Sequence, residues 1–453
     1  MPNDNRQSIH ARICFYMLAA LPCLMLNAAY ARESWPEFRG PSGQGHVTTK
    51  GLPSTWSETE NVTWKTPIPG SGWSSPVIDR GQIWLTTSTH ITLTGAEREA
   101  RVKGLVNPRS LSAVDDLRLR AICVDQKSGK ILHDIELLTP ENPPPIHNLN
   151  SHASPTPVIE KGRLYTHFGT HGTVCIDTKS GKAIWKNTSL PVTHNNGPGS
   201  SIVLWKNNVI FHADGSDIQY IVALDKRTGD IAWKTDRTGK LNQNPDFKKA
   251  YGTPLITKIH GRDQLVSPAS DWLYGYDPVT GEELWKLSYE TLGFSIVPRP
   301  VAGHGMVFFS TSFNTAEILA VRFQDADGDC EPALAWRYKR GAPSQPSPLL
   351  VGSELYIVND RSGVATCLDA LTGKELWKER VGGSYSASPT HADGRIFFSN
   401  REGETTVLEA GRTPKQLARN KLDGRHMASF AAVDGAFFIR TDKALYRIEE
   451  TTR

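Results

Sequence analysis

An eleven-residue phrase recurs along this chain and limits its fold more than any other feature. Each copy ends an apolar run in Asp, continues through a turn containing Ser or Thr followed by Gly, and places Trp eight positions after the Asp. The clearest copies are CIDTKSGKAIW (175–185), ALDKRTGDIAW (223–233), GYDPVTGEELW (275–285) and CLDALTGKELW (367–377). Because a phrase repeated at this spacing marks one supersecondary unit, we predict a repeat architecture.

Weaker copies extend the pattern over most of the chain. The copy at 123–133 has His133 in place of Trp, the copy at 321–336 has a longer turn, and the copy at 407–417 lacks both Asp and Trp. Upstream of each copy, small residues and Pro precede a second pair of apolar β runs, so each unit is predicted to hold four short strands. Four-stranded units repeated radially are the blades of a β-propeller.

Counting these units predicts an all-β, eight-bladed propeller of four-stranded antiparallel blades. The units begin near Ser74, Ser154, Ser200, Gly252, Pro298, Ser347, Ala387 and Ala428. The last unit supplies only three strands, and NVTWKTPIP (61–69) has the form of the missing outer strand. We therefore expect this N-terminal strand to close the ring, which would remove the open sheet edges. Seven blades remain an alternative if the degenerate unit at 385–422 is not a blade.

The recurring phrase resembles the tryptophan-docking repeat of pyrroloquinoline-quinone (PQQ)-type propellers, and the resemblance covers roughly residues 61–450. That superfamily includes quinoprotein alcohol dehydrogenases and the propeller lipoprotein of the outer-membrane β-barrel assembly machine. The resemblance implies the fold, but it does not imply a bound quinone, because the family contains propellers that bind none. Where quinone is bound, it stacks on aromatic side chains beside calcium, and an Asp acts as base. Here Trp73 and Tyr251 would stack, and Asp271 would be the base.

The chain divides into three predicted parts. Residues 1–31 have the pattern of a secretory signal peptide, with cleavage expected near Ala31, which predicts an extracytoplasmic (periplasmic or secreted) protein. Residues 32–60 form an N-terminal wrapping segment, and residues 61–453 form the propeller. A long insertion at 88–120 separates two strands of the first blade, and we expect a short helix at 111–120 within it.

Charge and cysteine content exclude some functions. The net charge of +4 over 453 residues argues against a nucleic-acid-binding protein, for which a concentrated basic stripe is expected. Cys123, Cys175 and Cys367 occupy the same position of three repeats, which suits a small buried residue better than a disulfide partner. The chain has no adjacent Cys-Cys pair and no C-x-x-C-H haem signature, so no built-in electron acceptor is visible.

The Trp residues of the phrase are predicted to be structural. Each offers a large flat face and one N–H group for packing against a neighbouring blade. The predicted blade-docking residues are Trp64, Trp185, Trp233, Trp285, Trp336 and Trp377. Propeller topology places their turns on one face of the ring, and the loops that lead into the innermost strands on the other face, which we call the funnel face.

Equivalent residues at the start of the innermost strands form a pattern of their own. They are Ser75, Thr156, Ser201, Thr253, Arg299, Ser347, Ser388 and Ser429. One interpretation is that only small residues fit at a crowded axis, where their hydroxyls bond to backbone or water. The alternative is a polar channel mouth in which Arg299 is the single fixed charge and binds a carboxylate or phosphate.

The funnel-face loops supply further binding candidates. They are Arg299, His152, His194, Asn195, Asn196, Tyr251, Asp360, Arg361 and Tyr385. A weak calcium candidate consists of Asp325, Asp327 and Asp329 in an acidic turn on the opposite face, where a merely acidic turn is the alternative.

These patterns predict a non-catalytic binding or scaffold protein that uses its funnel face. A protein, peptide or glycan is the expected partner, the protein is expected to be a monomer without a cofactor, and peripheral membrane association is left open. The alternative is a quinone-dependent oxidoreductase acting on an alcohol or sugar with PQQ and calcium, since fold alone does not assign function.

Overall fold

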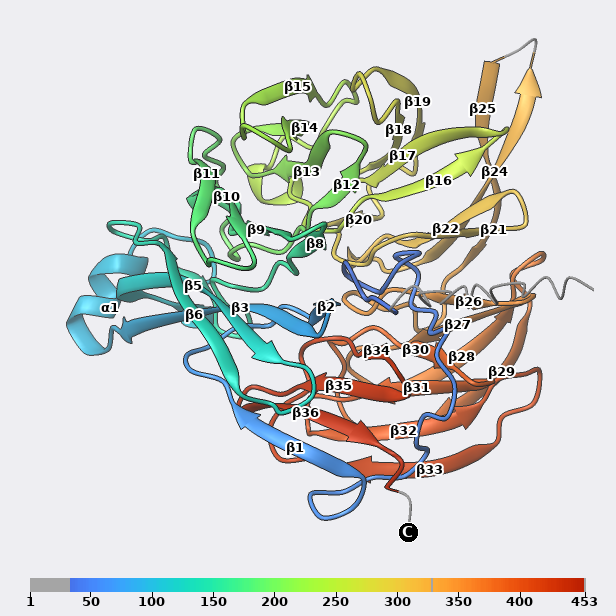
Figure 1. Ribbon diagram of the computed structural model, residues 1–453. Helices are drawn as coiled ribbons and strands as arrows, with labels where there is room; N and C mark the ends of the chain where they lie inside the picture. The colour runs from blue at the N-terminus through green and yellow to red at the C-terminus, as the bar shows by residue number, and fades with distance from the viewer. Residues whose placement is uncertain (1–32, 327–328, 452–453) are drawn as a thin grey trace, which may run out of the picture. The chain divides into compact units, whose positions relative to one another are not determined.

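Eight four-stranded antiparallel sheets form a ring, as the repeat predicts (Figure 1). The computed structural model describes residues 33–326 and 329–451, without the side chains of 325–329. The predicted signal peptide at 1–31 lies outside the described residues, and the calcium candidate Asp325, Asp327 and Asp329 lies outside the described side chains. Within the described part, no helix is long and apolar enough to cross a membrane.

Within each of blades 1 to 7 the strands follow one another from the axis outward in chain order, and blade 8 takes its outermost strand from the N-terminal side of the chain. Blade 1 consists of β2 (Val77–Asp79), β3 (Gln82–Thr92), β5 (Val114–Asp125) and β6 (Ile131–Leu138). Blade 2 consists of β8 (Val158–Glu160), β9 (Arg163–His167), β10 (Thr173–Asp177) and β11 (Ala183–Asn187). Blade 3 consists of β12 (Val203–Trp205), β13 (Asn208–Asp214), β14 (Gln219–Asp225) and β15 (Ile231–Asp236). Blade 4 consists of β16 (Leu255–Ile259), β17 (Arg262–Pro268), β18 (Trp272–Tyr276) and β19 (Glu283–Ser288).

The second half of the ring repeats this arrangement. Blade 5 consists of β21 (Val301–Gly303), β22 (Met306–Ser310), β24 (Ile318–Ala326) and β25 (Asp329–Tyr338). Blade 6 consists of β26 (Leu349–Val351), β27 (Glu354–Val358), β28 (Val364–Asp369) and β29 (Glu375–Arg380). Blade 7 consists of β30 (Thr390–Ala392), β31 (Arg395–Ser399), β32 (Glu404–Glu409) and β33 (Gln416–Lys421). Blade 8 consists of β34 (Ala431–Val433), β35 (Ala436–Arg440), β36 (Ala444–Glu449) and β1 (Val62–Pro67).

Blade 8 contains both ends of the propeller. The N-terminal strand β1 pairs antiparallel with the C-terminal strand β36, from Pro67 opposite Ala444 to Val62 opposite Ile448. The predicted closure of the ring is therefore confirmed. Because β1 covers the outer edge of β36, the last blade has four strands like the others.

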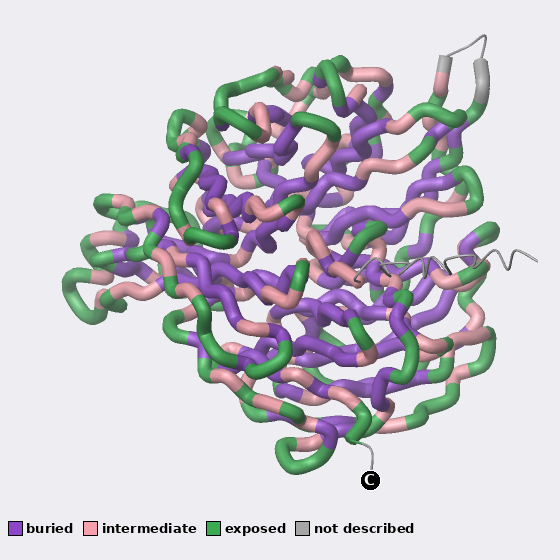
Figure 2. The backbone as a smooth tube through the Cα atoms, in the orientation of Figure 1, coloured by how far each residue is buried: buried purple, intermediate pink, exposed green. Residues whose placement is uncertain are grey.

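The hydrophobic core is divided into layers between neighbouring blades. One layer joins Val77 and Trp84 of blade 1 to Leu164 and Ile176 of blade 2, and comparable layers follow around the ring. Buried residues therefore lie mainly in the strands toward the middle of the molecule, and exposed residues lie mainly in the outer turns (Figure 2). Each blade is stabilised by the apolar faces of its two neighbours.

The Trp of the repeated phrase lies on the turn Gly of the next blade. The Trp185 Nε1–H donates to the Lys226 carbonyl at 3.0 Å, and its ring covers Gly229. Trp64 makes the same contact across the ring closure, donating to the Gln126 carbonyl at 3.2 Å and covering Gly129. The same pairing recurs for Trp233 on Gly281 and Trp336 on Gly373, and Trp377 donates to the Gly411 carbonyl.

Blades 1 and 4 depart from this docking pattern. In blade 1, His133 takes the place of Trp beside Gly181 and stacks on Trp84 with ring centroids 5.7 Å apart. In blade 4, the Trp285 Nε1–H donates to Gln264 of its own blade, and the ring contacts Phe323 of blade 5. Blade 5 carries the lengthened turn, so Trp285 has no short Gly turn to cover.

In blades 1 to 4 and 6 the repeated Asp holds the turn in the way the sequence indicates. The Asp277 carboxylate accepts the backbone N–H groups of Val279 and Thr280, and Gly281 follows with a φ of +77°. Gly takes this left-handed conformation without the strain that a side chain would cause.

The cysteines of the repeat are buried. Cys123, Cys175 and Cys367 form no disulfide and lie in the strands next to the docking Trp or His. Burial raises the pKa of each thiol to about 12, so all three are protonated and unreactive at neutral pH.

The insertion in blade 1 differs from its predicted form. Its helix is α1 (Gly95–Val102), whereas residues 111–120, predicted to be helical, belong to β4 (Leu111–Ser112) and β5. The alternation of Leu117 and Leu119 with Arg118 and Arg120 has the period of a strand. The two arginines pair across the hairpin with Glu136 and Asp134 of β6, so these charges lie on an outer sheet surface.

Short elements complete the fold around the funnel face. β4 pairs with β7 (Ile146–His147), and β20 (Gly293–Phe294) pairs with β23 (Phe313–Asn314). Three 3₁₀ turns lie in loops, η1 (Pro108–Ser110), η2 (Gly169–His171) and η3 (Pro245–Phe247).

The N-terminal segment has two parts. Residues 35–47, here called the plug, hydrogen-bond to Ile78, Ile159, Ala302 and His391 of the innermost strands. Residues 50–60 then pass along blade 7, where the Trp56 N–H donates to Asn420 of β33. The plug thus fills the axis of the ring, and the remainder leads outward to β1 (Figure 1).

Gly229→Ala tests the Trp-on-Gly contact. An added Cβ would lie 2.5 Å from Trp185, and we expect the variant to lose about 1–3 kcal/mol of unfolding free energy more than its control. The control is Gly162→Ala, since Gly162 has the same φ of +79° and its nearest neighbour would be 3.8 Å away. Urea denaturation measures both, and equal losses in the two variants would contradict the contact.

Candidate functional site

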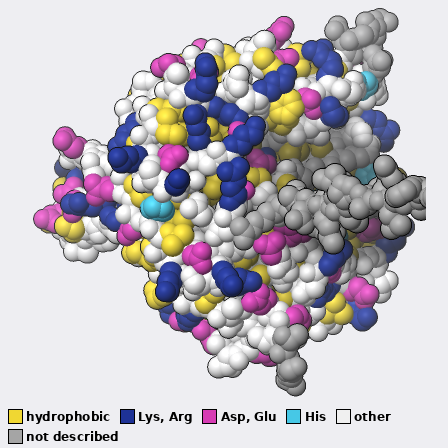
Figure 3. All heavy atoms as spheres, viewed as in Figure 1, with side chains coloured by type: hydrophobic (Ala, Val, Ile, Leu, Met, Phe, Trp, Pro, Cys, Tyr) yellow, Lys and Arg dark blue, Asp and Glu magenta, His cyan; other side chains and the backbone are white. Residues whose placement is uncertain are grey.

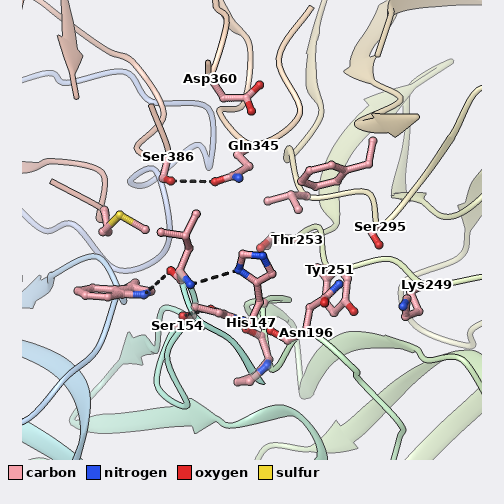
Figure 4. A pocket seen from close by; sticks show the side chains of 18 of the residues that line it. His147, Ser154, Asn196, Lys249, Tyr251, Thr253, Ser295, Gln345, Asp360 and Ser386 are labelled. Carbon is pink, nitrogen blue, oxygen red and sulfur yellow. Dashed lines mark hydrogen bonds between the residues drawn. The ribbon is translucent and has the colours of Figure 1, made fainter. Parts of the chain in front are cut away.

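A cavity of about 810 Å³ opens on the funnel face of the ring. Its walls come from the loops that lead into the innermost strands, and from loops between the second and third strands of the blades. Figure 4 shows Gln345, Ser386 and Asp360 on one side and Tyr251 and Lys249 on another. The volume lies within the range of small-ligand and peptide pockets.

The floor of the cavity is the ring of hydroxyl residues predicted from the repeat. At seven of the eight equivalent positions, the residue donates its backbone N–H to the side-chain hydroxyl of its counterpart in the next blade. The observed N–H to Oγ pairs are Ser75–Thr156, Thr156–Ser201, Ser201–Thr253, Arg299–Ser347, Ser347–Ser388, Ser388–Ser429 and Ser429–Ser75, at 2.9 to 3.1 Å. The hydroxyls are therefore structural acceptors that join the blades at the axis, as the first of the two interpretations proposed.

Within the described residues this circle is interrupted between Thr253 and Arg299, because arginine has no hydroxyl to accept a bond. The Arg299 guanidinium instead donates to the Phe38 carbonyl at 2.6 Å, to the Pro254 carbonyl at 3.1 Å and to the Glu37 carboxylate at 3.3 Å. Arg299 is 2% exposed and does not line the cavity. In the structure Arg299 is therefore bonded to residues 35–47, which form the plug. The sequence had offered it as a free charge for binding a ligand.

The plug closes the channel beneath the hydroxyl ring. Phe38 of the plug lines the cavity together with the seven hydroxyl residues, so an apolar ring lies at the centre of a polar circle. A ligand on the funnel face meets this floor before it reaches the far side of the ring.

One wall of the cavity, from blades 6 and 7, is cationic. Arg401 donates to Ser386 at 2.8 Å, to Gln345 at 2.9 Å and to the Tyr385 carbonyl at 3.1 Å. These bonds fix two of its three guanidinium nitrogens on the protein. Neighbouring Arg361 lines the same wall with a side chain that is 81% exposed.

Asp360 lies in the same wall but already has a partner. Its carboxylate accepts the Ser344 N–H at 2.7 Å and lies 4.0 Å from the Arg361 guanidinium. Arg401 and Arg361 therefore leave this wall with a net positive charge.

The wall from blades 3 to 5 is aromatic. Phe294 and Phe313 are opposite each other in the β20–β23 pair, and Phe247 stacks on Phe294 with ring centroids 4.5 Å apart. Lys249 lies below them and pairs with Asp246 at 2.8 Å, while Asp246 also accepts from Asn195. The two charges compensate each other, which leaves an apolar surface opposite the cationic wall.

The wall from blades 1 and 2 is polar and includes the insertion. Trp73 donates to the Leu149 carbonyl at 3.0 Å, and Asn150 donates to the Asn196 carbonyl at 2.7 Å. Val106, Asn107 and Ser110 of the insertion also line the cavity, so the insertion extends this wall.

The structure brings together five of the nine predicted funnel-face residues. Asn195, Asn196, Tyr251, Asp360 and Arg361 line the cavity. Arg401, Gln345 and Phe294 were missed. Arg401 follows the second strand of blade 7 at the same place as the Asp360–Arg361 pair in blade 6, and this equivalence was the available signal.

The other predicted residues lie behind the cavity walls. His152 and His194 are buried, and burial lowers their pKa values to about 3 and about 4, so both are neutral at neutral pH. Tyr385 is fully buried beneath Arg401. Asp271, the candidate base, is 8% exposed in the β17–β18 loop and does not line the cavity. Burial raises the pKa of Asp271 to about 6.

The residues of the cavity do not fit a quinone paired with a metal. Hard cations need several carboxylate or carbonyl oxygens, yet the part of the chain that the structure describes holds no group of three or more His, Cys, Asp or Glu able to bind a metal. The two lining carboxylates, Asp246 and Asp360, are engaged by Lys249 and by Ser344. The predicted base Asp271 is not among the residues that line this cavity.

Comparison with known proteins identifies relatives of two kinds. A family model described as "Outer membrane protein assembly factor BamB" matches residues 41–235, 116–327 and 217–452, which together cover most of the chain. The chain is also 27% identical over 222 residues to the 1-butanol dehydrogenase (quinone) of Thauera butanivorans. That match covers 44% of this chain and 32% of the enzyme, so the chain corresponds to about a third of the enzyme's length.

Solved structures with the same fold also include both kinds. BamB from Moraxella catarrhalis has a TM-score of 0.52 at 12% identity, covering 75% of this chain and 96% of BamB. A europium-containing methanol dehydrogenase has a TM-score of 0.62 at 11% identity, covering 91% of this chain and 90% of the enzyme. At such identities the likeness establishes the propeller fold alone.

Ser388→Ala tests the hydroxyl ring. The substitution removes the acceptor for the buried Ser347 N–H, and we expect a loss of about 1–3 kcal/mol of unfolding free energy. Ser388→Thr keeps a hydroxyl, as Thr156 and Thr253 do in the ring, and should retain most of the stability. Thermal and urea denaturation compare the three proteins. An alanine variant as stable as the wild type would show that the ring bonds contribute nothing.

Asp271→Asn tests the raised pKa. A carboxyl whose pKa is raised on folding stabilises the protein below its unfolded pKa, and that stabilisation is lost as pH rises through the folded pKa. Wild type should therefore lose stability relative to Asp271→Asn between about pH 4 and about pH 6. Denaturation midpoints of both proteins across this range measure the difference, and parallel pH profiles would refute the assignment.

Proposed function

We propose that this chain, which belongs to the family described as outer membrane protein assembly factor BamB, is a non-catalytic binding protein. The observation that supports this is the cavity on the funnel face, with a cationic wall opposite an aromatic one. Such a surface can hold a ligand by charge and by apolar burial at once, and none of its lining groups is poised for chemistry.

The proposed ligand is an extended segment of a partner protein. Arg361 and Arg401 offer guanidinium donors to a carboxylate, while Phe247, Phe294 and Phe313 offer a surface for an apolar side chain. An acidic side chain and an apolar one, displayed on one peptide, would contact both walls. The hydroxyl oxygens of the floor already accept backbone N–H groups around the ring.

The remaining parts of the proposal follow from the sequence and the family. We propose an extracytoplasmic protein that is processed near Ala31, with residues 32–60 leading into a propeller at 61–453. It would act as a monomer, without nucleic acid, either free or attached peripherally to a membrane assembly. Charged side chains of both signs are interspersed on the face seen in Figure 3, in keeping with this.

The second candidate is a quinone-dependent oxidoreductase with PQQ and calcium, and the similarity to the butanol dehydrogenase favours it. Against it stand the engaged carboxylates of the cavity and the position of Asp271 outside it.

Selection from a display library of random peptides tests the binding function. We expect enriched peptides to combine acidic and apolar residues, and to bind Arg361→Ala about tenfold or more weakly than wild type, since a charge-assisted hydrogen bond is lost. Arg80→Ala is the matched control, because Arg80 is also an exposed arginine (68%) and lies in the β2–β3 turn outside the cavity. Fluorescence anisotropy measures the affinities.

A second arm tests the oxidoreductase directly. Purified full-length protein is mixed with PQQ and calcium, and bound-quinone absorbance and dye reduction with butanol are recorded. We expect neither stoichiometric quinone nor turnover. Stoichiometric quinone with turnover would overturn the binding proposal. Selected peptides that bind Arg361→Ala as tightly as wild type would reject the proposed ligand.

A further inference from the structure

Arg39 of the plug is a buried arginine without a partner. The residue is 1% exposed, and all three of its guanidinium nitrogens are buried without a hydrogen-bond partner among the described residues. Its backbone has a φ of +68°, a left-handed conformation that is uncommon outside glycine. The turn from Glu37 to Gly40 holds it there, through the Gly40 N–H to Glu37 carbonyl bond at 3.0 Å. The fold thus directs this side chain into the protein interior.

The groups around Arg39 carry an excess of positive charge. The second guanidinium nearby, Arg299, is paired with the carboxylate of Glu37 at 3.3 Å. Among the described residues Arg39 has no carboxylate partner of its own, and burial together with the charge of Arg299 lowers the pKa of Arg39 to about 9.

The neighbouring histidines do not supply a negative charge. His46 and His391 approach each other with Nδ1 atoms 3.5 Å apart. Burial, His391 and Arg39 together lower the pKa of His46 to about 4, so the ring is neutral at neutral pH. Lys50 and Asp393, which lie beyond His391, pair with each other at 3.1 Å. The excess charge at Arg39 is not compensated from this side.

A buried guanidinium in this state is costly unless something pairs with it. Burial of a charged group without hydrogen bonds costs several kcal/mol, and more if its charge is also unpaired. Water would supply acceptors but would leave the excess charge in place. An anion would supply acceptors and would also neutralise it.

We propose that the axial channel holds a small monovalent anion of the chloride, bromide or nitrate class on the guanidinium of Arg39. With this anion, the two arginines face two negative charges, those of the anion and of Glu37. The anion would fasten the plug at the axis, beneath the floor of the cavity. The site is independent of the proposed peptide-binding function, because Arg39 and Glu37 do not line the cavity.

Anomalous scattering from bromide tests the site directly. Crystals of the full-length protein are soaked in sodium bromide and measured at the bromine absorption edge. We expect one ordered peak in contact with the Arg39 guanidinium. A water molecule or a protein acceptor bonded to Arg39, with no anomalous peak there, would overturn the proposal.

Thermal denaturation tests the same site in solution. Bromide replaces fluoride from about 1 to about 100 mM at constant ionic strength, and the Tm of wild type should rise by about 1–2 °C for each tenfold increase above the dissociation constant. Arg39→Met should abolish this rise. Arg440→Met is the matched control, because Arg440 is also buried, but its Nη1 already donates to the carbonyls of Ser74 and Thr86.

Each outcome of the thermal test either supports or rejects the anion site. A bromide response that persists in Arg39→Met, or is absent in wild type, would reject the site. If Arg39→Met does not fold, the wild-type and Arg440→Met titrations still decide, since both should show the rise.

Discussion

The bond from each backbone N–H at the axis to the hydroxyl of the next blade is the constraint on which the rest of this propeller depends. It requires Ser or Thr at one position of nearly every blade, and it joins blade to blade where the strands are closest together. Because the acceptor is a side chain and the donor is backbone, the link is lost wherever the hydroxyl is lost. Arg299 is the one departure, and its guanidinium is bonded to the N-terminal plug.

This arrangement separates stability from recognition. The Trp-on-Gly contacts join neighbouring blades toward the outer strands, and the hydroxyl ring joins them at the axis. The funnel-face loops are left free to vary, and they form a cavity whose walls differ in character from blade to blade. Phe38 lies in its floor, so the propeller presents a cavity with chemically different walls in place of an open channel.

Much of the fold was readable from the sequence because its signals are local. Asp277, Gly281 and Trp285 lie within nine residues of one another, and the same spacing recurs in each clear copy. The hydroxyl ring was also readable, since Ser388 and its counterparts share a repeat position. The plug was not, because the contact of Phe38 with Arg299 joins residues 261 positions apart. Only some of the residues that line the cavity were predicted. Arg401 lines it and His194 does not, because this depends on loop conformations that the repeat does not encode.

The proposed role of the funnel-face cavity, which is to hold a segment of a partner protein, can be checked by a crystal structure of the protein with a selected peptide. We expect peptide density in this cavity, with a carboxylate on Arg361 or Arg401 and an apolar side chain against Phe294. Peptide bound on the outer wall or along a sheet edge, with the cavity empty, would contradict it.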